Sequence, residues 1–509
     1  MNPNRLVESW VNGRASVGSE GLSIAPKTGI DPSEKLRQAY HWIAQNAIYS
    51  LHADIAFGDT LNCGDGRQQI ELAKGDSYSS FILLPLLTLA TSRRMVIIGA
   101  PGRGKTTIAT LMALLSGSPL PEVRRHIQHG HPQLTVADLL GSPLPSDLVK
   151  AERIKDVQVS WRSWIKQRVK IIDEYNRIPT KTQSSLLSLL SEGYAEMYEQ
   201  TVVCGPSAWF LTANDDIGGG TFPVIEALRD RIDIAVRCTP FHSRCISSLD
   251  ARISNAQEAV DFVPSSIVFT DAEVEAAGRT IRAIAFPPDV QSVVGFMMGQ
   301  LDFCLRASDQ LEYKNKDTLH LAGKRVSQVC NEDCPLDKNE NSCTQTENGV
   351  SARTYQTMIH FAKALACFRG RKEVSLDDVR QLLPWILHEK LQPNIASSFF
   401  QKQENQALLT DRVSWIRRLL DEAVSQYAAY LPIREPIEEL IQQVDAGSLL
   451  SPVEVRNLLD RIRRHIERVL AGQEFNGPVY EDLLLLKSLH SRCQSRLNQL
   501  EGKSPADHP

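Results

Sequence analysis

The sequence lacks any apolar run of about 18 residues, the length that a membrane-spanning helix needs. Its first residues, 1–5, also lack the basic stretch and apolar run of a secretory signal. The densest apolar segment, 81–87, is too short to span a bilayer and predicts a buried helix. The ten cysteines stand mostly apart in apolar segments, unlike a secreted disulfide framework. We therefore expect a cytoplasmic protein without a membrane span.

An excess of charge of one sign is also missing. Lysine and arginine number 56 against 60 aspartate and glutamate, so the net charge of -4 gives no general reason to expect nucleic acid or an anionic membrane as partner. The composition, 42% hydrophobic and 23% charged, is typical of a globular protein. A length of 509 residues predicts two or three domains.

Hydrophobic patterning predicts an N-terminal leader over 1–79 and an α/β domain over 80–242. The leader contains one amphipathic helix whose apolar face would comprise Leu36, Tyr40, Ile43, Ala47 and Leu51. The second stretch alternates helical runs with short apolar strands at 95–98, 169–172 and 208–212. This alternation predicts a mostly parallel sheet covered by helices on both faces.

Strand signals fade after Phe241, and helix-capping patterns such as those at 270–273 and 375–378 replace them. Residues 243–400 therefore predict a helical lid, interrupted near 315–348 by a polar insertion expected to be a loop or excursion. Residues 401–509 predict a C-terminal helical domain. Its last two helices, starting near Ser451 and around Leu483, could pack as an antiparallel pair with Gly477-Pro478 in the turn.

A phosphate-binding motif follows the first apolar strand and opens a helix. It has the form G-x-x-x-x-G-K-[ST] and comprises Gly99, Ala100, Pro101, Gly102, Arg103, Gly104, Lys105 and Thr106, with Thr107 next in the helix. Backbone amides of such a loop surround a β-phosphate, and the lysine reaches the β- and γ-phosphates. Thr106 would supply a hydroxyl to Mg²⁺. The motif predicts binding of ATP with Mg²⁺ rather than a chance glycine-rich turn.

Two adjacent carboxylates end a second apolar strand. Asp173 is expected to contact the Mg²⁺, and Glu174 is expected to polarise the attacking water. Asn214, at the end of a third strand, could position that water. Further along, Arg229 and Arg231 each offer a guanidinium that could reach the γ-phosphate of a neighbouring subunit, and a structural salt bridge is the alternative for either.

These residues together resemble the AAA+ ATPases, and more closely the MoxR family with its RavA-like members. The resemblance rests on Asp173-Glu174-Tyr175-Asn176-Arg177, on Lys181-Thr182-Gln183 with the leucine run after it, and on Thr212-Ala213-Asn214 at the sensor 1 position. It covers about residues 80–395. It implies an α/β P-loop core with a parallel sheet, followed by an α-helical lid and a C-terminal helical region.

The resemblance also implies roles for two arginines and a set of partners. Arg231 maps onto the finger that acts in trans, and Arg353, in the triplet Ser351-Ala352-Arg353, maps onto sensor 2, which contacts the nucleotide in cis. Relatives of this type form rings, hexamers being expected, and usually work with a von Willebrand A domain protein to remodel, activate or load a client complex. Two other hypotheses are a DNA-directed motor or helicase-loader, and a nucleotide-dependent scaffold, against which Glu174 speaks.

Three further segments carry alternative hypotheses. Cys330, Cys334 and Cys343, with His320, could hold zinc, but unligated thiols fit their spacing better. Residues 124–131 are basic and histidine-rich, which we interpret as a strand with subunit contacts rather than a nucleic-acid site. Residues 161–168 could face the pore of a ring and grip a client, or anchor beneath the sheet.

Overall fold

The computed structural model describes residues 31–65, 68–150, 153, 157–214, 221–255, 258–330, 333–445, 451–472 and 475–501. Its internal contacts divide the chain into two compact units. The first unit holds the residues up to 286 together with 352–386, and the second holds 287–351 and everything from 387. None of the described helices combines the length and the apolar character that crossing a membrane requires.

The core of the first unit is a five-stranded parallel sheet in the order β13-β5-β12-β9-β6. The middle strand is buried along its whole length, as a sheet covered on both faces requires. The three apolar strands predicted from the sequence are confirmed as β5, β9 and β12. The strands are β5 (Arg94–Ile98), β6 (Gln128–His129), β9 (Val169–Asp173), β12 (Ala208–Ala213) and β13 (Ile234–Arg237).

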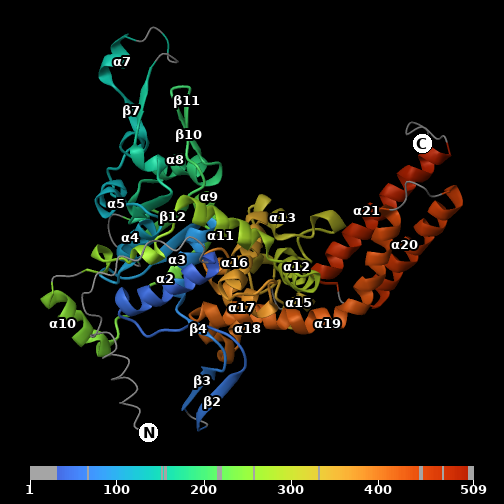
Figure 1. The fold of residues 1–509 in the computed structure, drawn as a ribbon. Coiled ribbons are helices and arrows are strands. Elements are labelled where there is room, and N and C mark those ends of the chain that lie inside the picture. The colour runs from blue at the N-terminus through green and yellow to red at the C-terminus, as the bar shows by residue number, and fades with distance from the viewer. Residues whose placement is uncertain are drawn as a thin grey trace. The chain divides into compact units, whose positions relative to one another are not determined.

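Helices pack on this sheet within the first unit (Figure 1). Helix α3 is buried from Ser80 to Ala90, which confirms the buried helix expected at 81–87, and Pro85 lies inside it. The segment 124–131, expected as a strand, is helical up to His126 and only then forms the short β6. The helices are α3 (Ser80–Thr91), α4 (Lys105–Leu115), α5 (Leu120–His126), α6 (Val136–Leu140), α8 (Thr180–Ser191) and α9 (Glu226–Arg231).

Two β-ribbons extend from the same side of the α/β core (Figure 1). One pairs β7 (Gly141–Pro143) with β8 (Val159–Trp161) and carries α7 (Pro145–Lys150) beyond β7; the other pairs β10 (Tyr194–Met197) with β11 (Gln200–Val203). The Gln200 side chain joins them, because its Oε1 accepts from the Val159 amide at 3.1 Å. The ribbons therefore form one linked projection.

The N-terminal part of the first unit begins with Asp31, which caps α2 (Pro32–Asn46), and residues 1–30 lie outside the described part. The predicted amphipathic helix is confirmed, but it ends at Asn46, so Leu51 falls beyond it and is 45% exposed rather than on the buried face. Four short strands follow that the sequence did not indicate. They are β1 (Ile55–Ala56), β2 (Thr60–Asp65), β3 (Gln68–Ala73) and β4 (Ser77–Tyr78).

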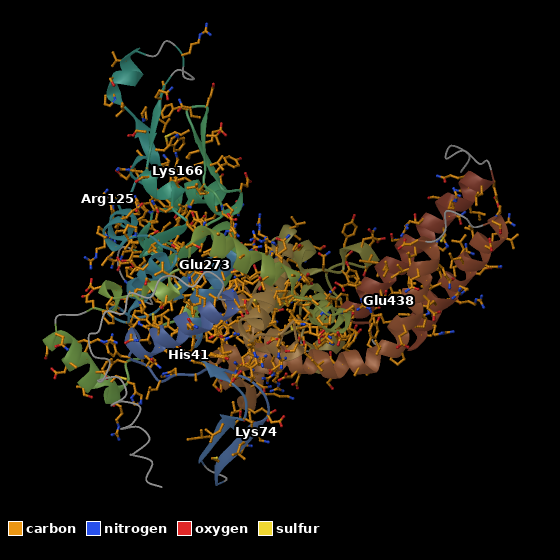
Figure 2. All side chains as sticks on the ribbon, viewed as in Figure 1. His41, Lys74, Arg125, Lys166, Glu273 and Glu438 are labelled. Carbon is orange, nitrogen blue, oxygen red and sulfur yellow. The ribbon has the colours of Figure 1, made fainter. Side chains whose placement is uncertain are left out.

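The helices after the sheet show the capping predicted from the sequence. Thr270 and Glu273 exchange hydrogen bonds at the start of α11, and Ser375 and Asp378 do the same before α17. Glu273 (Figure 2) also binds Lys35 of α2 at 2.9 Å, which ties the leader helix to this region. The helices are α10 (Ile246–Ser254), α11 (Asp271–Ala283), α16 (Ala352–Phe368) and α17 (Leu376–Leu387).

The second unit is helical. Its last two helices, α20 and α21, pack as the expected antiparallel pair, since Arg456 contacts Glu501 while Arg463 contacts His490. Gly477 and Pro478 open α21 instead of forming the turn. The helices are α12 (Pro288–Asp302), α13 (Lys316–Leu321), α14 (Val326–Val329), α15 (Pro335–Lys338), α18 (Ser398–Gln401), α19 (Arg412–Asp445), α20 (Pro452–Gly472) and α21 (Gly477–Leu500).

The sequence predicted a loop or an inserted excursion near 315–348. This segment forms short helices, and its polar side chains from Ser342 to Thr346 are almost fully buried. Two of these residues are hydrogen-bonded to distant side chains: the Trp415 indole donates to Gln345 Oε1 at 3.0 Å, and Asn394 Nδ2 donates to the Thr344 carbonyl at 2.9 Å. This packing groups 287–351 with the C-terminal helices in one compact unit.

Candidate functional site

The glycine-rich loop lies between β5 and α4, at the carboxyl edge of the sheet. Gly102 and Gly104 have φ angles of 75° and 77°, a left-handed conformation that glycine adopts without strain. Gly104 caps α4, whose first residue is Lys105. The loop therefore turns sharply and directs backbone amides and a helix N-terminus to one point, which is the arrangement that holds phosphate.

Lys105 is 7% exposed and folds back over this loop. Its ammonium donates to the carbonyl oxygens of Gly99 at 2.6 Å and Ala100 at 3.0 Å, and to Asn214 Oδ1 at 2.8 Å. The lysine is thus held between the loop and the end of β12. Its charge lies where a bound triphosphate would need it.

One carboxylate oxygen of Asp173 accepts hydrogen bonds from two threonine hydroxyls. Thr106 Oγ1 lies 2.8 Å from Asp173 Oδ1, and Thr212 Oγ1 lies 2.6 Å from the same atom. Hydroxyl and carboxylate oxygens are the ligands that Mg²⁺ prefers, so the donor set of Thr106 and Asp173 fits that ion. The sequence indicated both of these residues, whereas it gave no sign that Thr212 would hold the carboxylate.

Glu174 takes a left-handed conformation with φ of 55°, and its amide donates to Thr212 Oγ1 at 2.9 Å. Asn214 Nδ2 donates to Glu174 Oε1 at 2.8 Å, and Arg177 lies 3.3 Å from Glu174 Oε2. Asn214 therefore bridges Lys105 and Glu174 through the two ends of one amide. The sequence indicated Asn214 but not the pairing of Arg177, although that arginine belongs to the Asp-Glu-x-Asn-Arg signature.

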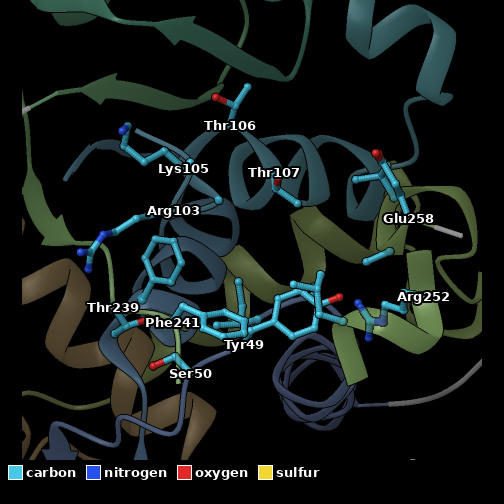
Figure 3. A pocket seen from close by; sticks show the side chains of 18 of the residues that line it. Tyr49, Ser50, Arg103, Lys105, Thr106, Thr107, Thr239, Phe241, Arg252 and Glu258 are labelled. Carbon is cyan, nitrogen blue, oxygen red and sulfur yellow. The ribbon is translucent and has the colours of Figure 1, made fainter. Parts of the chain in front are cut away.

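A cavity of about 920 Å³ opens beside the loop (Figure 3). Lys105 and Thr106 lie on one side of it, and Tyr49 and Arg252 lie on the other. The Arg252 guanidinium lies 5.2 Å from the centre of the Tyr49 ring, and Phe241 packs on that ring with centroids 6.0 Å apart. This combination of a cationic loop and an aromatic wall suits a nucleotide, whose phosphates are charged and whose base is flat.

Sequence reasoning missed the aromatic wall, since its members come from three separate segments without a motif. Of the residues assigned to nucleotide binding, those that border the cavity are Gly102, Arg103, Gly104, Lys105, Thr106 and Thr107.

Two family matches coincide with this site and with the helices after it. Residues 94–232 match the AAA domain (dynein-related subfamily), and residues 338–411 match the AAA lid domain. The chain carries an AAA+ ATPase domain. The predicted fold class, a parallel-sheet AAA+ core followed by a helical lid and a C-terminal helical region, is confirmed, and ATPase is the enzyme class of this protein.

One solved structure similar to the chain is that of a candidate ATPase from Cytophaga hutchinsonii. It aligns with a TM-score of 0.50 and 17% identity, over 76% of this chain and 94% of that one. At this identity the likeness concerns the fold. No curated protein sequence matches the chain.

The three arginines for which the sequence predicted a phosphate contact lie outside the described cavity lining, in other parts of the first unit. Arg231 ends α9, where its Nε donates to Ser191 Oγ at 3.0 Å and its Nη1 to the Ala227 carbonyl at 2.8 Å. Arg229 is on the same helix, with Nη2 3.5 Å from the Val224 carbonyl. Arg353 begins α16 and pairs with Asp230 at 2.8 Å. Among the described residues, the cavity lining includes none of these three arginines.

The remaining candidate residues make contacts inside the fold. Trp164 is buried, and its indole donates to the Leu139 carbonyl at 2.7 Å, so it anchors beneath the sheet rather than facing a pore. Cys330, Cys334 and Cys343 are buried in an apolar cluster, while the His320 ring binds the Glu347 carbonyl. In the described part of the chain, no three potential ligands lie close enough together to hold a metal ion, which speaks against the zinc hypothesis.

Proposed function

We propose that this chain is a MoxR-type AAA+ ATPase that hydrolyses Mg·ATP in a ring, expected to be a hexamer, to remodel a client complex. The observation that carries the proposal is the bridge formed by Asn214. Its Oδ1 accepts from Lys105 at 2.8 Å, and its Nδ2 donates to Glu174 at 2.8 Å. One side chain thus links the residue that reaches the phosphates to the residue that would activate water.

Each polar group at the sheet edge has one role in ATP hydrolysis. Lys105 and the loop amides bind the phosphates, and Thr106 with Asp173 would hold Mg²⁺, which when bound offsets charge on the β- and γ-phosphates. Glu174 then polarises the attacking water, and Asn214 orients Glu174 and that water. Thr212 keeps the two carboxylates in place, because its hydroxyl donates to Asp173 and accepts from the Glu174 amide.

Replacing Glu174 tests the hydrolytic step. Glu174→Gln keeps the hydrogen bond from Asn214 but removes the negative charge, so phosphate release should fall at least about 100-fold while ATP binding stays within a few fold. Asp271→Asn, on the lid side of the same unit, is a matched loss of one exposed carboxylate and should retain activity. Undiminished hydrolysis by Glu174→Gln would refute the role of Glu174.

The ring is the second part of the proposal. Arg231 lies at the end of α9, where its guanidinium donates to Ser191 Oγ and to the Ala227 carbonyl rather than to the phosphate-binding loop. An arginine that acts in trans is expected to be worth about 10³-fold or more in rate. ATPase activity per subunit should therefore rise with protein concentration, and Arg231→Ala should remove most of that rise. Activity independent of concentration and of Arg231 would contradict a shared site.

The client and the von Willebrand A domain partner follow from the resemblance alone. The linked β-ribbons expose Tyr198 at the turn between β10 and β11 and Val203 at the other end of β11, and they offer a surface for such contacts. A von Willebrand A domain protein encoded beside this gene should co-purify with the chain in the presence of Mg·ATP. Failure of such a protein to bind, or stimulation of the ATPase by DNA instead, would favour the DNA-directed alternative.

A further inference from the structure

Two side chains of α16 contact α9 and the segment that follows it before β13, and the two contacts differ in burial. Thr357 Oγ1 donates to Asp233 Oδ1 at 2.6 Å, and Thr357 and Asp233 are 0% and 4% exposed. One turn earlier on the same face, Arg353 pairs with Asp230 at 2.8 Å, where the side chains are 49% and 29% exposed. The lid helix is thus held by one buried contact and one partly solvated ion pair.

The buried contact is the stronger of the two. Asp233 also accepts from the Arg94 amide at 2.9 Å, and the Arg94 side chain lies 3.3 Å away, so this carboxylate is fixed to strand β5. Breaking the bond from Thr357 would leave a buried hydroxyl and one oxygen of a buried carboxylate without this hydrogen bond, which is costly. The Arg353 pair is exposed, and pairs of that kind are weak and exchange readily. Arg353 can therefore change partner while Thr357 keeps α16 on Asp233.

We infer that Asp230 competes with nucleotide phosphate for Arg353, and so acts as a positioning residue that sets nucleotide affinity through the lid. The inference rests on the proposed ATPase function together with the sensor 2 role that the resemblance implies for Arg353, a contact with the nucleotide phosphates of its own chain. The Arg353 guanidinium is paired with Asp230 at 2.8 Å, so a contact of that guanidinium with phosphate would replace this ion pair. Each gain of contact with phosphate is then offset by the loss of the pair with Asp230.

The competition predicts a gain of affinity on removing Asp230. Asp230→Asn, which is close in shape, should lower the Kd for the β,γ-imido analogue of ATP with Mg²⁺ by about 2- to 5-fold, the range expected for an exposed ion pair. Arg353→Ala should raise that Kd. The double variant should bind the analogue like Arg353→Ala alone, because without the guanidinium Asp230 has no group for which it can compete with phosphate.

Glu226→Gln is the matched control, since Glu226 is an exposed carboxylate in the first turn of the same helix α9. It should leave the Kd unchanged; an equal gain there would assign the effect to general charge and overturn the inference. Asp230→Ser is a second variant that removes the same carboxylate, and melting temperatures check the fold of each.

The two possible failures are distinguishable in the same titrations. If Arg353→Ala weakens binding but neither Asp230 variant strengthens it, the competition is refuted while the role of Arg353 stands. If Arg353→Ala leaves the Kd unchanged, the proposed contact of Arg353 with the phosphates is wrong, and the inference fails with it.

Discussion

Lys105 in the first unit and Lys316 in the second are both buried lysines, but their surroundings differ. Lys105 is 7% exposed and Lys316 is 1% exposed, and both donate to backbone carbonyl oxygens. Lys105 borders a cavity of about 920 Å³ and touches Asn214, which leads to a carboxylate. Lys316 donates to the carbonyl of Thr346 at 2.7 Å and to its hydroxyl. Burial alone therefore does not identify a functional lysine; the adjoining cavity and polar relay do.

The environment of Lys316 disfavours its charge. Burial lowers the pKa of Lys316 to about 8, although nearby groups such as Cys343 and Asp302 act in the opposite direction. In the unfolded chain the pKa would be near its ordinary value of 10.5. Because the folded form binds its proton less tightly, stability from this group rises with pH between those values and is lowest below about 8. The comparison can therefore be tested with matched lysine substitutions.

The largest effect is expected at Lys105. Lys105→Met should lower the rate of ATP hydrolysis by about 10²- to 10³-fold, since it removes a positive charge placed for the phosphates. Phosphate release measures the rate. Lys316→Met should hydrolyse ATP within about twofold of wild type, and a comparable loss there would abolish the distinction between the two lysines.

Lys316→Met should instead change the pH dependence of stability. In wild type this residue adds up to about 1.4 kcal/mol per pH unit to the unfolding free energy as pH rises from 8 to 10.5. The variant should lack that contribution in urea titrations at pH 7, 8, 9 and 10. Lys324→Met, at an exposed position of the same insertion, should retain it. An unchanged slope in Lys316→Met would show that the lysine does not titrate as described.

A third buried lysine sharpens the comparison within the first unit. Lys170 is 1% exposed in β9, its ammonium donates to the Gln167 carbonyl at 2.7 Å, and burial lowers its pKa to about 8. Lys170→Met should raise the unfolding free energy at pH 7 by about 1–3 kcal/mol, because a buried charge is replaced by an apolar side chain of similar length. A lower melting temperature at pH 7 would count against this expectation.

The smallest effect is expected at Thr346, which is fully buried and binds Lys316 through its hydroxyl. Thr346→Val keeps the shape but removes that hydrogen bond, so it should lower the unfolding free energy by about 1 kcal/mol. In the Lys316→Met background the same change should cost less, because the partner is already gone. Equal costs in both backgrounds would mean that the hydroxyl does not serve the lysine.

The sequence predicted the AAA+ core well because its signals are local. The loop at Gly99, the apolar strands and the carboxylates at 173–174 each occupy a few consecutive residues, and parallel strands bring their ends to one edge. The contacts that it missed act across the chain. The bond from Thr212 to Asp173 and the place of Tyr49 beside the cavity join segments far apart in the sequence, so no spacing pattern could predict them.

The burial of the insertion near 315–348 was not predicted for a different reason. Its polar composition predicted a loop or an inserted excursion and gave no sign of burial, yet Gln345 and Thr346 are buried with hydrogen-bond partners more than 25 residues away. Hydrophobic patterning cannot detect a segment whose burial depends on polar groups satisfied by distant ones. The same limit applies to Arg353, which a motif indicated but whose pairing with Asp230 required the fold.

Mixing two inactive variants tests the central claim, a site shared between subunits, most directly. Lys105→Met retains Arg231 but cannot bind the phosphates normally, whereas Arg231→Ala retains the complete sheet-edge site. In a mixed ring some Arg231→Ala subunits would receive the arginine of a Lys105→Met neighbour. We predict that ATP hydrolysis by the mixture exceeds the sum of the two variants measured separately; a rate equal to that sum, with mixed oligomers present, would contradict the account.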